Sequence, residues 1–161
     1  MALDDDVALL ERVAVLHVLG RETLRILAIG AETRRLKAGE TLFREGEDAD
    51  CAYVVVDGTI ALKDVLNSGQ PEVQAGSGAL IGETALITQV RRPATAIARD
   101  DATLLRIPRN TFLRTLEGFP AAADKLQALL AQRMAETVAE LARVRQRLEN
   151  LGDAPQEPRP A

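Results

Sequence analysis

Hydrophobic and polar positions change their period twice along the chain, which divides it into three zones. In the first zone, residues 7–31, apolar side chains recur at helical spacing on both sides of Gly20. One stripe holds Leu9, Leu10, Val13 and Leu16, and the other holds Leu24, Leu27 and Ala28. Because residues three and four apart share one face of a helix, the pattern predicts two short helices joined at Leu19-Gly20.

Between residues 33 and 108 the pattern changes to β-branched or alternating runs separated by glycine turns. The clearest runs are 53–56, 59–63, 94–98 and 103–107, and the turns include Asp57-Gly58 and Asn67-Ser68-Gly69. Many short strands at near-regular spacing predict a β-sandwich or barrel. Asp57-Gly58, between two apolar runs, is the strongest hairpin signal of this zone.

The third zone, residues 109–152, is helical again. Asn110 is placed to cap a short helix that ends at Gly118, and Pro120 suits the first turn of a longer helix with no further Gly or Pro until Gly152. The expected fold is therefore mainly β with flanking helices: helices within 7–31, a β-roll over 33–108 and helices over 109–150. A Pro-rich, mobile tail is expected over 151–161.

The long helix carries a heptad seam that is broken only by Thr137. Its apolar members, four and three residues apart in alternation around Thr137, are Leu130, Met134, Leu141, Val144, Leu148 and Leu151. The spacing fits a helix that lies along its own β domain, and it equally fits a parallel coiled coil with a second copy. In a homodimer of this kind, Glu140 and Arg145 flank the seam as an interhelical ion pair. Both arrangements are present at once if the first turns of the helix pack on the β domain and the later turns dimerise.

Composition excludes several classes of protein. A chain of 161 residues with 47% apolar residues suits one domain with a real core. Aromatic residues make up only 2%, which leaves little surface for stacking the bases of single-stranded nucleic acid. The net charge of −4 and the pI near 5.1 provide no basic field for DNA or an anionic membrane. Neither DNA nor a membrane is therefore an expected partner.

Cys51 is the single cysteine and His17 the single histidine of the sequence. An internal disulfide, a cysteine-rich metal site and a histidine-based triad are therefore not expected. Cys51 itself reads as an inert, small hydrophobic residue. No apolar run reaches the ~20 residues of a membrane span, and the acidic N-terminus is unlike a secretory signal. We expect a cytoplasmic protein that is not an enzyme.

Residues 78–98 are the segment with the most candidate chemistry. Gly78 and Gly82 allow sharp turns, and residues 83–87 can form one or two turns of helix. A helix that opens from glycine presents unpaired amides to an anion, and Arg91 or Arg92 adds a planar fork that matches phosphate. A carboxylate such as Glu83 repels phosphate but accepts a hydroxyl group. Together these groups indicate a sugar phosphate as the ligand.

The pattern Gly-Glu-x-Ala-Leu-Ile over 82–87, followed after four residues by Arg-x-Ala-Thr over 92–95, resembles the phosphate-binding cassette of the cyclic nucleotide-binding domain family. This family includes the catabolite activator protein and the regulatory subunit of protein kinase A. The family's framework glycines, which form turns, correspond to Gly39, Gly46, Gly58 and Gly78. The resemblance covers roughly residues 7–150 and implies an eight-stranded jelly-roll barrel with helices before and after it, so that residues 1–150 form the domain.

The resemblance assigns seven positions to the ligand: Gly82, Glu83, Thr84, Ala85, Arg92, Pro93 and Ala94. The first four correspond to the start of the cassette helix, whose amides face the cyclic phosphate. Within them, Glu83 corresponds to the acceptor of the ribose 2′-hydroxyl. Arg92 corresponds to the phosphate-binding arginine, and Arg91 to a solvated neighbour.

Pro93 departs from the family pattern. This position usually donates a backbone amide to the phosphate, and a hydroxyl residue assists there in members that prefer cyclic GMP. Proline has no amide hydrogen, and loss of one hydrogen bond to a charged group costs about 1.5–3 kcal/mol, roughly ten- to a hundredfold in affinity. Without the hydroxyl, cyclic AMP is favoured over cyclic GMP as the ligand. We expect no separate cofactor.

Two functions are consistent with these features. The first is a sensor that binds a cyclic nucleotide and signals to an unknown downstream protein by moving its C-terminal helix. Because nine residues follow Gly152 in this sequence, we do not expect the helix-turn-helix domain of the family's transcription factors. The second function is a degenerate domain that no longer binds nucleotide and acts as a dimerising scaffold, with Glu83 and Arg92 paired to each other in an empty cassette.

Overall fold

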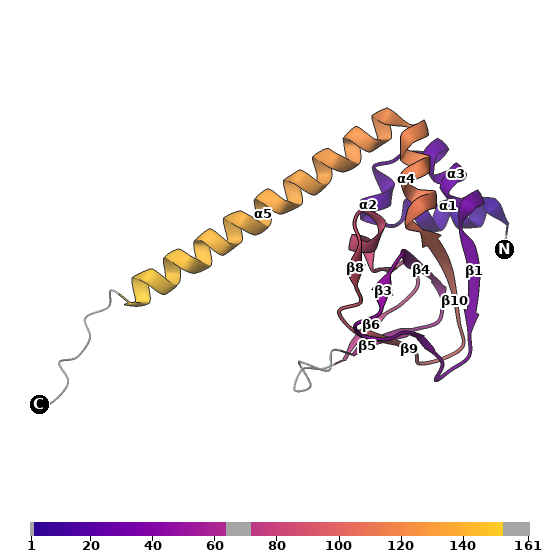
Figure 1. Cartoon of the computed structure of the whole chain (residues 1–161), viewed down its shortest axis with the longest axis horizontal. Helices are drawn as coiled ribbons and strands as arrows, with labels where there is room; N and C mark the ends of the chain where they lie inside the picture. Colours follow the sequence, from indigo (N-terminus) through magenta and orange to yellow (C-terminus); the bar gives the residue numbers. More distant parts are fainter. Residues whose placement is uncertain (1, 64–71, 153–161) are drawn as a thin grey trace, which may run out of the picture.

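The computed structural model describes residues 2–63 and 72–152, and it places a β-barrel beside a group of helices (Figure 1). The long C-terminal helix leaves the group of helices and extends away from the barrel (Figure 1). The expected turn at Asn67-Ser68-Gly69 and the tail from 153 to 161 lie outside the described residues. No helix in the described part of the chain is long and apolar enough to cross a membrane.

The first zone folds into three helices where two were predicted: α1 (Leu3–Glu11), α2 (Ala14–His17) and α3 (Arg21–Gly30). The additional break lies at Val13, whose backbone is extended. The predicted joint at Gly20 is confirmed, since this residue has φ of 85° and precedes α3. Leu10, Leu16, Leu24 and Leu27 are fully buried, so the apolar stripes do mark the faces that pack together.

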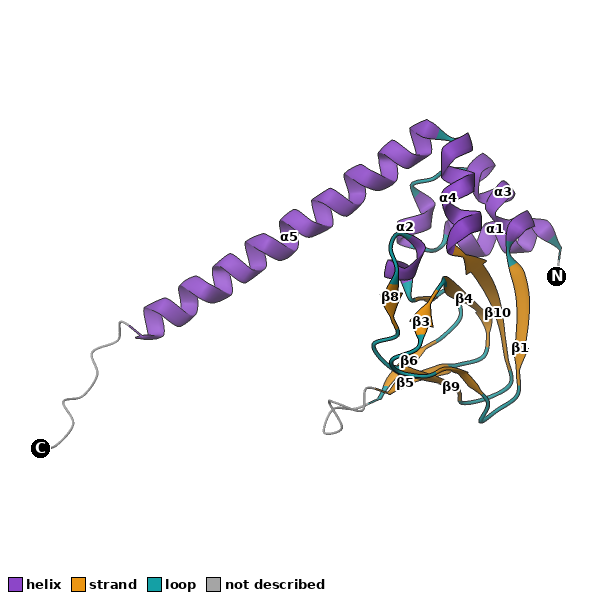
Figure 2. Ribbon diagram, viewed as in Figure 1, coloured by secondary structure: helices purple, strands orange, loops and turns teal. Residues whose placement is uncertain are grey.

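The described residues contain ten strands, all in antiparallel pairings. They are β1 (Glu32–Leu36), β2 (Thr41–Phe43), β3 (Asp48–Ala49), β4 (Cys51–Asp57), β5 (Ile60–Lys63), β6 (Val73–Ala75), β7 (Leu80–Ile81), β8 (Val90–Arg91), β9 (Thr95–Ala98) and β10 (Ala102–Pro108). Two four-stranded sheets have the orders β1-β10-β4-β7 and β2-β9-β5-β6, and β3 pairs with β8 in a separate ribbon. The eight strands of the two sheets confirm the jelly-roll prediction (Figure 2).

The hairpin predicted at Asp57-Gly58 is wrong, because β4 and β5 belong to different sheets. The turn instead carries the chain from one sheet to the other. Gly58 has φ of 89°, and a Cβ there would lie 2.6 Å from the carbonyl oxygen of Asp101. Glycine is therefore needed because the turn packs directly against the backbone that joins β9 to β10.

Two hydrophobic cores position the elements. The inner core lies between the two sheets, with members such as Phe43, Tyr53 and Ile60. The outer core joins the helices to the other face of β4 and β10, with members such as Val54 and Ile107. Alternate residues of β4 thus serve different cores, as the two-residue period of a strand requires.

The chain after the barrel forms α4 (Arg109–Gly118) and α5 (Pro120–Gly152). The start of α5 at Pro120 confirms the prediction. Asn110 is not the cap of α4, because the helix continues directly from β10 and Pro108 takes the cap position with an extended backbone.

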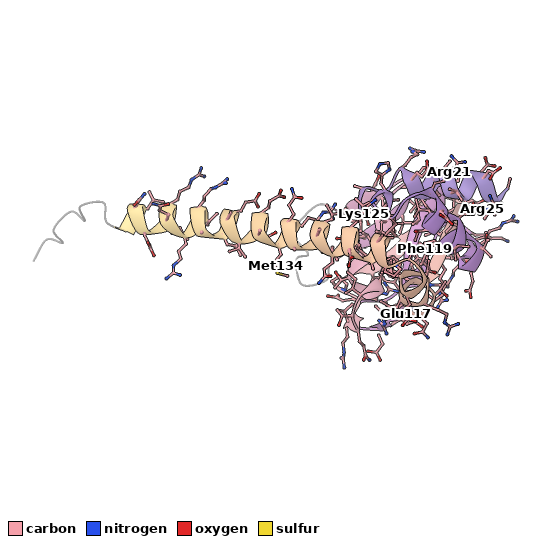
Figure 3. All side chains as sticks on the ribbon, turned by 90° about the horizontal axis from the view of Figure 1, so that it is seen from above. Arg21, Arg25, Glu117, Phe119, Lys125 and Met134 are labelled. Carbon is pink, nitrogen blue, oxygen red and sulfur yellow. The ribbon has the colours of Figure 1, made fainter. Side chains whose placement is uncertain are left out.

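The long helix α5 packs on the body only through its first turns. Ala122 and Leu126 are buried and Leu130 is half-buried, but Met134 is 71% exposed. From there the helix projects away from the body (Figure 3). Packing along the chain's own domain therefore accounts only for the beginning of the heptad seam.

Candidate functional site

The cassette segment (residues 82–95) begins with a tight turn at Gly82, which has the left-handed φ of 77°. A short 3₁₀ helix, η2 (Glu83–Leu86), follows it. Ala85 and Leu86 are buried and anchor this helix, whereas Glu83 and Thr84 face outward. A Cβ at Gly82 would lie 2.5 Å from Nη1 of Arg92, so the absence of a side chain lets the arginine lie against the turn.

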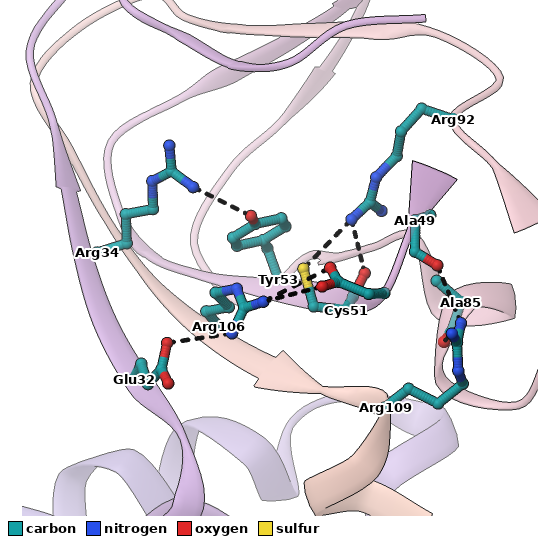
Figure 4. A network of polar contacts seen from close by, with 10 residues as sticks. Glu32, Arg34, Ala49, Cys51, Tyr53, Ala85, Arg92, Arg106 and Arg109 are labelled. Atoms are coloured by element: carbon teal, nitrogen blue, oxygen red, sulfur yellow. Dashed lines mark hydrogen bonds and ion pairs between the residues drawn. The ribbon is translucent and has the colours of Figure 1, made fainter. Parts of the chain in front are cut away.

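Arg92 follows β8 and points into the barrel, where it is only 5% exposed. Its Nη2 donates hydrogen bonds to the carbonyl oxygen of Cys51 at 2.8 Å and to the thiol Sγ of the same residue at 3.3 Å (Figure 4). Its Cζ lies 4.3 Å from the ring centroid of Phe43 and 5.7 Å from that of Tyr53. Its Nη1 is buried and has no hydrogen-bond partner among the described residues.

Two aromatic rings lie beside this guanidinium. Phe43 and Tyr53 stack with their ring centroids 6.1 Å apart and offer their faces to the cation. Burial raises the pKa of the Tyr53 phenol, and the neighbouring Cys51 acts in the same direction, so the phenol remains uncharged at neutral pH. The hydrogen-bond partners of Arg92 in the described chain are a backbone carbonyl and a sulfur atom, with no carboxylate among them, and a buried cation without a carboxylate counter-ion is costly.

A cavity of about 220 Å³ lies beside Arg92 and the cassette turn. Five of the seven predicted ligand positions line it, namely Gly82, Thr84, Ala85, Arg92 and Pro93. Ala94 is half-buried next to them but is not part of its wall. The fold therefore brings most of the predicted set around one space, on the side where the buried cation lies.

Glu83 faces a neighbouring, mainly apolar groove of about 140 Å³ between the cassette and α5. Leu86, Phe112, Leu126 and Leu130 line it. The carboxylate of Glu83 is 49% exposed and lies 3.7 Å from Nη1 of Arg133 on α5. In this structure Glu83 therefore pairs with α5 and not with Arg92.

Arg91 lies where a solvated neighbour was expected. Its side chain is 79% exposed and pairs loosely with Asp48 at 3.9 Å. Both adjacent arginines border the cavity described above, but Arg91 ends β8 with an exposed side chain, whereas Arg92 turns inward and is buried.

Sequence reasoning missed four residues that support the site: Phe43, Cys51, Arg109 and Arg133. Nη1 of Arg109 donates to the carbonyl oxygens of Ala49 at 2.9 Å and Ala85 at 3.2 Å (Figure 4). It also donates to the carbonyl oxygen of Thr88 at 3.2 Å, and together these contacts tie the cassette to the start of α4. The heptad pattern placed Arg133 on the long helix, but no sequence signal indicated its contact with Glu83. For Arg109, the sequence shows only that an arginine follows the last predicted strand directly, which does not indicate its contacts with the cassette.

Comparison with known proteins adds independent evidence. A family model described as "Cyclic nucleotide-binding domain" matches residues 33–118. The "Cyclic AMP receptor protein" of Thermus thermophilus is 32% identical over 127 residues, 78% of this chain and 59% of that protein. The chain also matches a "Lysophospholipase nte1" of Aspergillus fumigatus, 32% identical over 65% of the chain, but spans only 7% of that protein.

Solved structures of proteins that are described as cyclic nucleotide-binding or as transcriptional regulators are also similar to this chain. A "Cyclic nucleotide-binding-like protein" from Brucella abortus is 44% identical, with a TM-score of 0.64, and the match covers 71% of this chain and 99% of that one. The N-terminal domain of a transcriptional regulator from Streptomyces coelicolor is 28% identical with a TM-score of 0.76, covering 83% and 94% respectively.

Proposed function

The chain belongs to the family of cyclic nucleotide-binding domains, and on this basis we propose that residues 1–150 form a regulatory module that binds cyclic AMP in preference to cyclic GMP. The observation that carries the proposal is the buried guanidinium of Arg92, whose Nη1 has no partner in the described chain and which lines a cavity. A cyclic phosphate carries one negative charge, and its oxygens would complete the hydrogen bonding of Nη1. A charge-assisted contact of this kind is among the stronger hydrogen bonds available to a protein.

The other predicted positions have complementary tasks. Gly82, Thr84 and Ala85 line the same cavity as Arg92, where their backbone can approach the phosphate closely. Glu83 would accept the ribose 2′-hydroxyl from the neighbouring groove. The preference for cyclic AMP rests on Pro93, which also lines the cavity and offers neither an amide hydrogen nor a hydroxyl group.

Signalling would pass from Glu83 to the long helix. In the present structure Arg133 of α5 holds the Glu83 carboxylate at 3.7 Å. A ribose hydroxyl that binds Glu83 competes with Arg133 and so weakens the contact between α5 and the cassette. Nucleotide binding would then shift the population of α5 positions, as expected when a ligand prefers one of two states.

We further propose that α5 dimerises through its heptad seam. Beyond Leu130, the apolar members Met134, Leu141, Val144 and Leu148 are more than half exposed. A row of exposed apolar side chains that repeats by fours and threes suits a parallel coiled coil with a second copy. Sedimentation velocity of Leu141→Asp tests this: the variant should be monomeric, whereas Ala139→Asp, on the opposite face of the helix, should remain dimeric. A monomeric wild-type chain would refute the proposal.

Isothermal titration with cyclic AMP and cyclic GMP tests the ligand. Arg92→Ala should abolish binding, because it removes the buried guanidinium that lines the cavity. Arg35→Ala is the matched control and should bind like the wild type, since Arg35 is exposed on β1 and does not line the cavity. If the wild-type chain gives neither heat nor a shift in melting temperature with either nucleotide, the proposed sensor is wrong and the degenerate scaffold is favoured.

A further inference from the structure

One residue of β4 holds the guanidinium of Arg92 from the floor of the barrel. Cys51 accepts hydrogen bonds from Nη2 through both its carbonyl oxygen, at 2.8 Å, and its Sγ, at 3.3 Å. Cys51 is 1% exposed and lies 41 positions before Arg92 in the sequence. No other hydrogen bond to this guanidinium occurs within the described residues, so Cys51 alone determines the direction of Nη2.

These contacts orient the whole guanidinium, because the group is planar. With Nη2 fixed at Cys51 and the ring of Phe43 4.3 Å from Cζ, the plane of the group has little freedom to rotate. Nη1 then lies against Gly82, at the edge of the cavity. The unpartnered donor is thus held, buried, beside the glycine that lines the cavity.

The chemical type of the contact matters as much as its direction. A thiol is a weak, uncharged acceptor, so it orients Nη2 without neutralising the arginine. A carboxylate at the same position would pair with Arg92 and compete with an incoming phosphate. The prediction of an inert hydrophobic cysteine therefore describes the burial of Cys51 correctly but not its polar contact.

We propose that Cys51 is a positioning residue for the anion site: its Sγ holds Nη2 so that Nη1 of Arg92 meets the phosphate. The proposal rests on the proposed function. Preorganisation of this kind increases affinity because the guanidinium loses less freedom on binding.

Three variants test the role of the thiol by titration with cyclic AMP. Cys51→Val replaces the thiol with a somewhat larger apolar side chain that has no acceptor, and its affinity should fall about three- to tenfold, the usual effect of one uncharged acceptor. Cys51→Ser keeps an acceptor and should stay within about twofold of the wild type. Val54→Ala is the control: it removes buried volume from the other core and should lower stability without changing affinity. Equal affinities for wild type and Cys51→Val overturn the proposal.

A second readout does not depend on nucleotide. Hindered rotation of a held guanidinium separates the NMR signals of its Nη protons, and loss of signals in Arg92→Lys identifies those of Arg92. We expect separate signals in the ligand-free wild type and faster exchange between them in Cys51→Val, which keeps the carbonyl contact but loses that of Sγ. If the wild type binds no nucleotide, the proposed function fails, but this comparison still decides the positioning role: identical signals in both proteins refute it.

Discussion

Replacing Gly82 with alanine forces a methyl group into the contact between the cassette turn and Arg92. The new Cβ would lie 2.5 Å from Nη1 of Arg92 and 3.7 Å from the carbonyl oxygen of Cys51. Gly39→Ala is a matched control, because Gly39 has a similar φ of 87° and its Cβ would meet nothing within 4 Å. The difference between the two variants therefore isolates the cost of displacing the arginine.

The magnitude follows from the contacts that Arg92 would lose. Both variants carry the strain of a left-handed alanine, about 1–2 kcal/mol. In Gly82→Ala the end of Arg92 must also move away, which breaks a charged hydrogen bond, about 1.5–3 kcal/mol, and a cation–π contact, about 0.5–2 kcal/mol. Rehydration of the displaced guanidinium offsets part of this loss, so we expect Gly82→Ala to be less stable than Gly39→Ala by about 1–2 kcal/mol.

Urea unfolding of both variants measures this difference, and titration with cyclic AMP adds a functional readout. Gly82→Ala should lose affinity at least tenfold, because Nη1 no longer reaches the cavity, whereas Gly39→Ala should keep wild-type affinity. Equal destabilisation of the two variants would show that Arg92 does not rest on Gly82. Wild-type affinity in Gly82→Ala would refute the placement of the ligand beside this turn.

Three further substitutions probe the frame of the site. Arg109→Met should lower the free energy of unfolding in urea by about 1.5–3 kcal/mol, because three carbonyls lose a charged donor, and the exposed Arg114→Met should not. Gly58→Ala should be less stable than Gly82→Ala, because its Cβ would meet immobile backbone of residue 101 at 2.6 Å; equal urea midpoints would contradict this. Hydrogen bonding to Arg99 lowers the pKa of Glu72 below 4.5, so its stabilisation is present above that pH and is lost as the pH falls through the folded value. The gap in urea midpoint between wild type and Glu72→Gln should accordingly close in acid, and a gap that persists at about pH 2.5 would contradict the assignment.

The three zones of the fold were predictable because the period of apolar residues reports directly which side of an element is buried. Strand pairing was not, as Asp57-Gly58 illustrates. A turn of this composition forms a hairpin when the flanking strands pair with each other, but here each strand finds different partners. Gly58 is required for the close approach of residue 101, a contact that depends on the assembled sheets.

The candidate site divides in the same way. Its cassette segment is contiguous in sequence, so the spacing from Gly82 to Arg92 could be read directly. Its floor comes from β2 and β4, where Phe43 and Cys51 look like ordinary inward-facing strand residues. Only the folded barrel brings them to the guanidinium. The alternation of a strand shows which residues face the barrel interior, but not which distant side chain they will contact there.

The contact between Glu83 and Arg133 limits how strongly the nucleotide can act through it alone. Both side chains are close to half exposed, and ion pairs in such positions contribute about 0–1 kcal/mol. Since a ligand shifts an equilibrium only by its difference in affinity for the two states, breaking this pair changes the population of α5 positions about fivefold at most. A larger response requires a second element whose two states have nearly equal free energies. The seam of α5 is such an element in our proposal, because the way its apolar residues pack against a second helix would change once the first turns are released from the cassette.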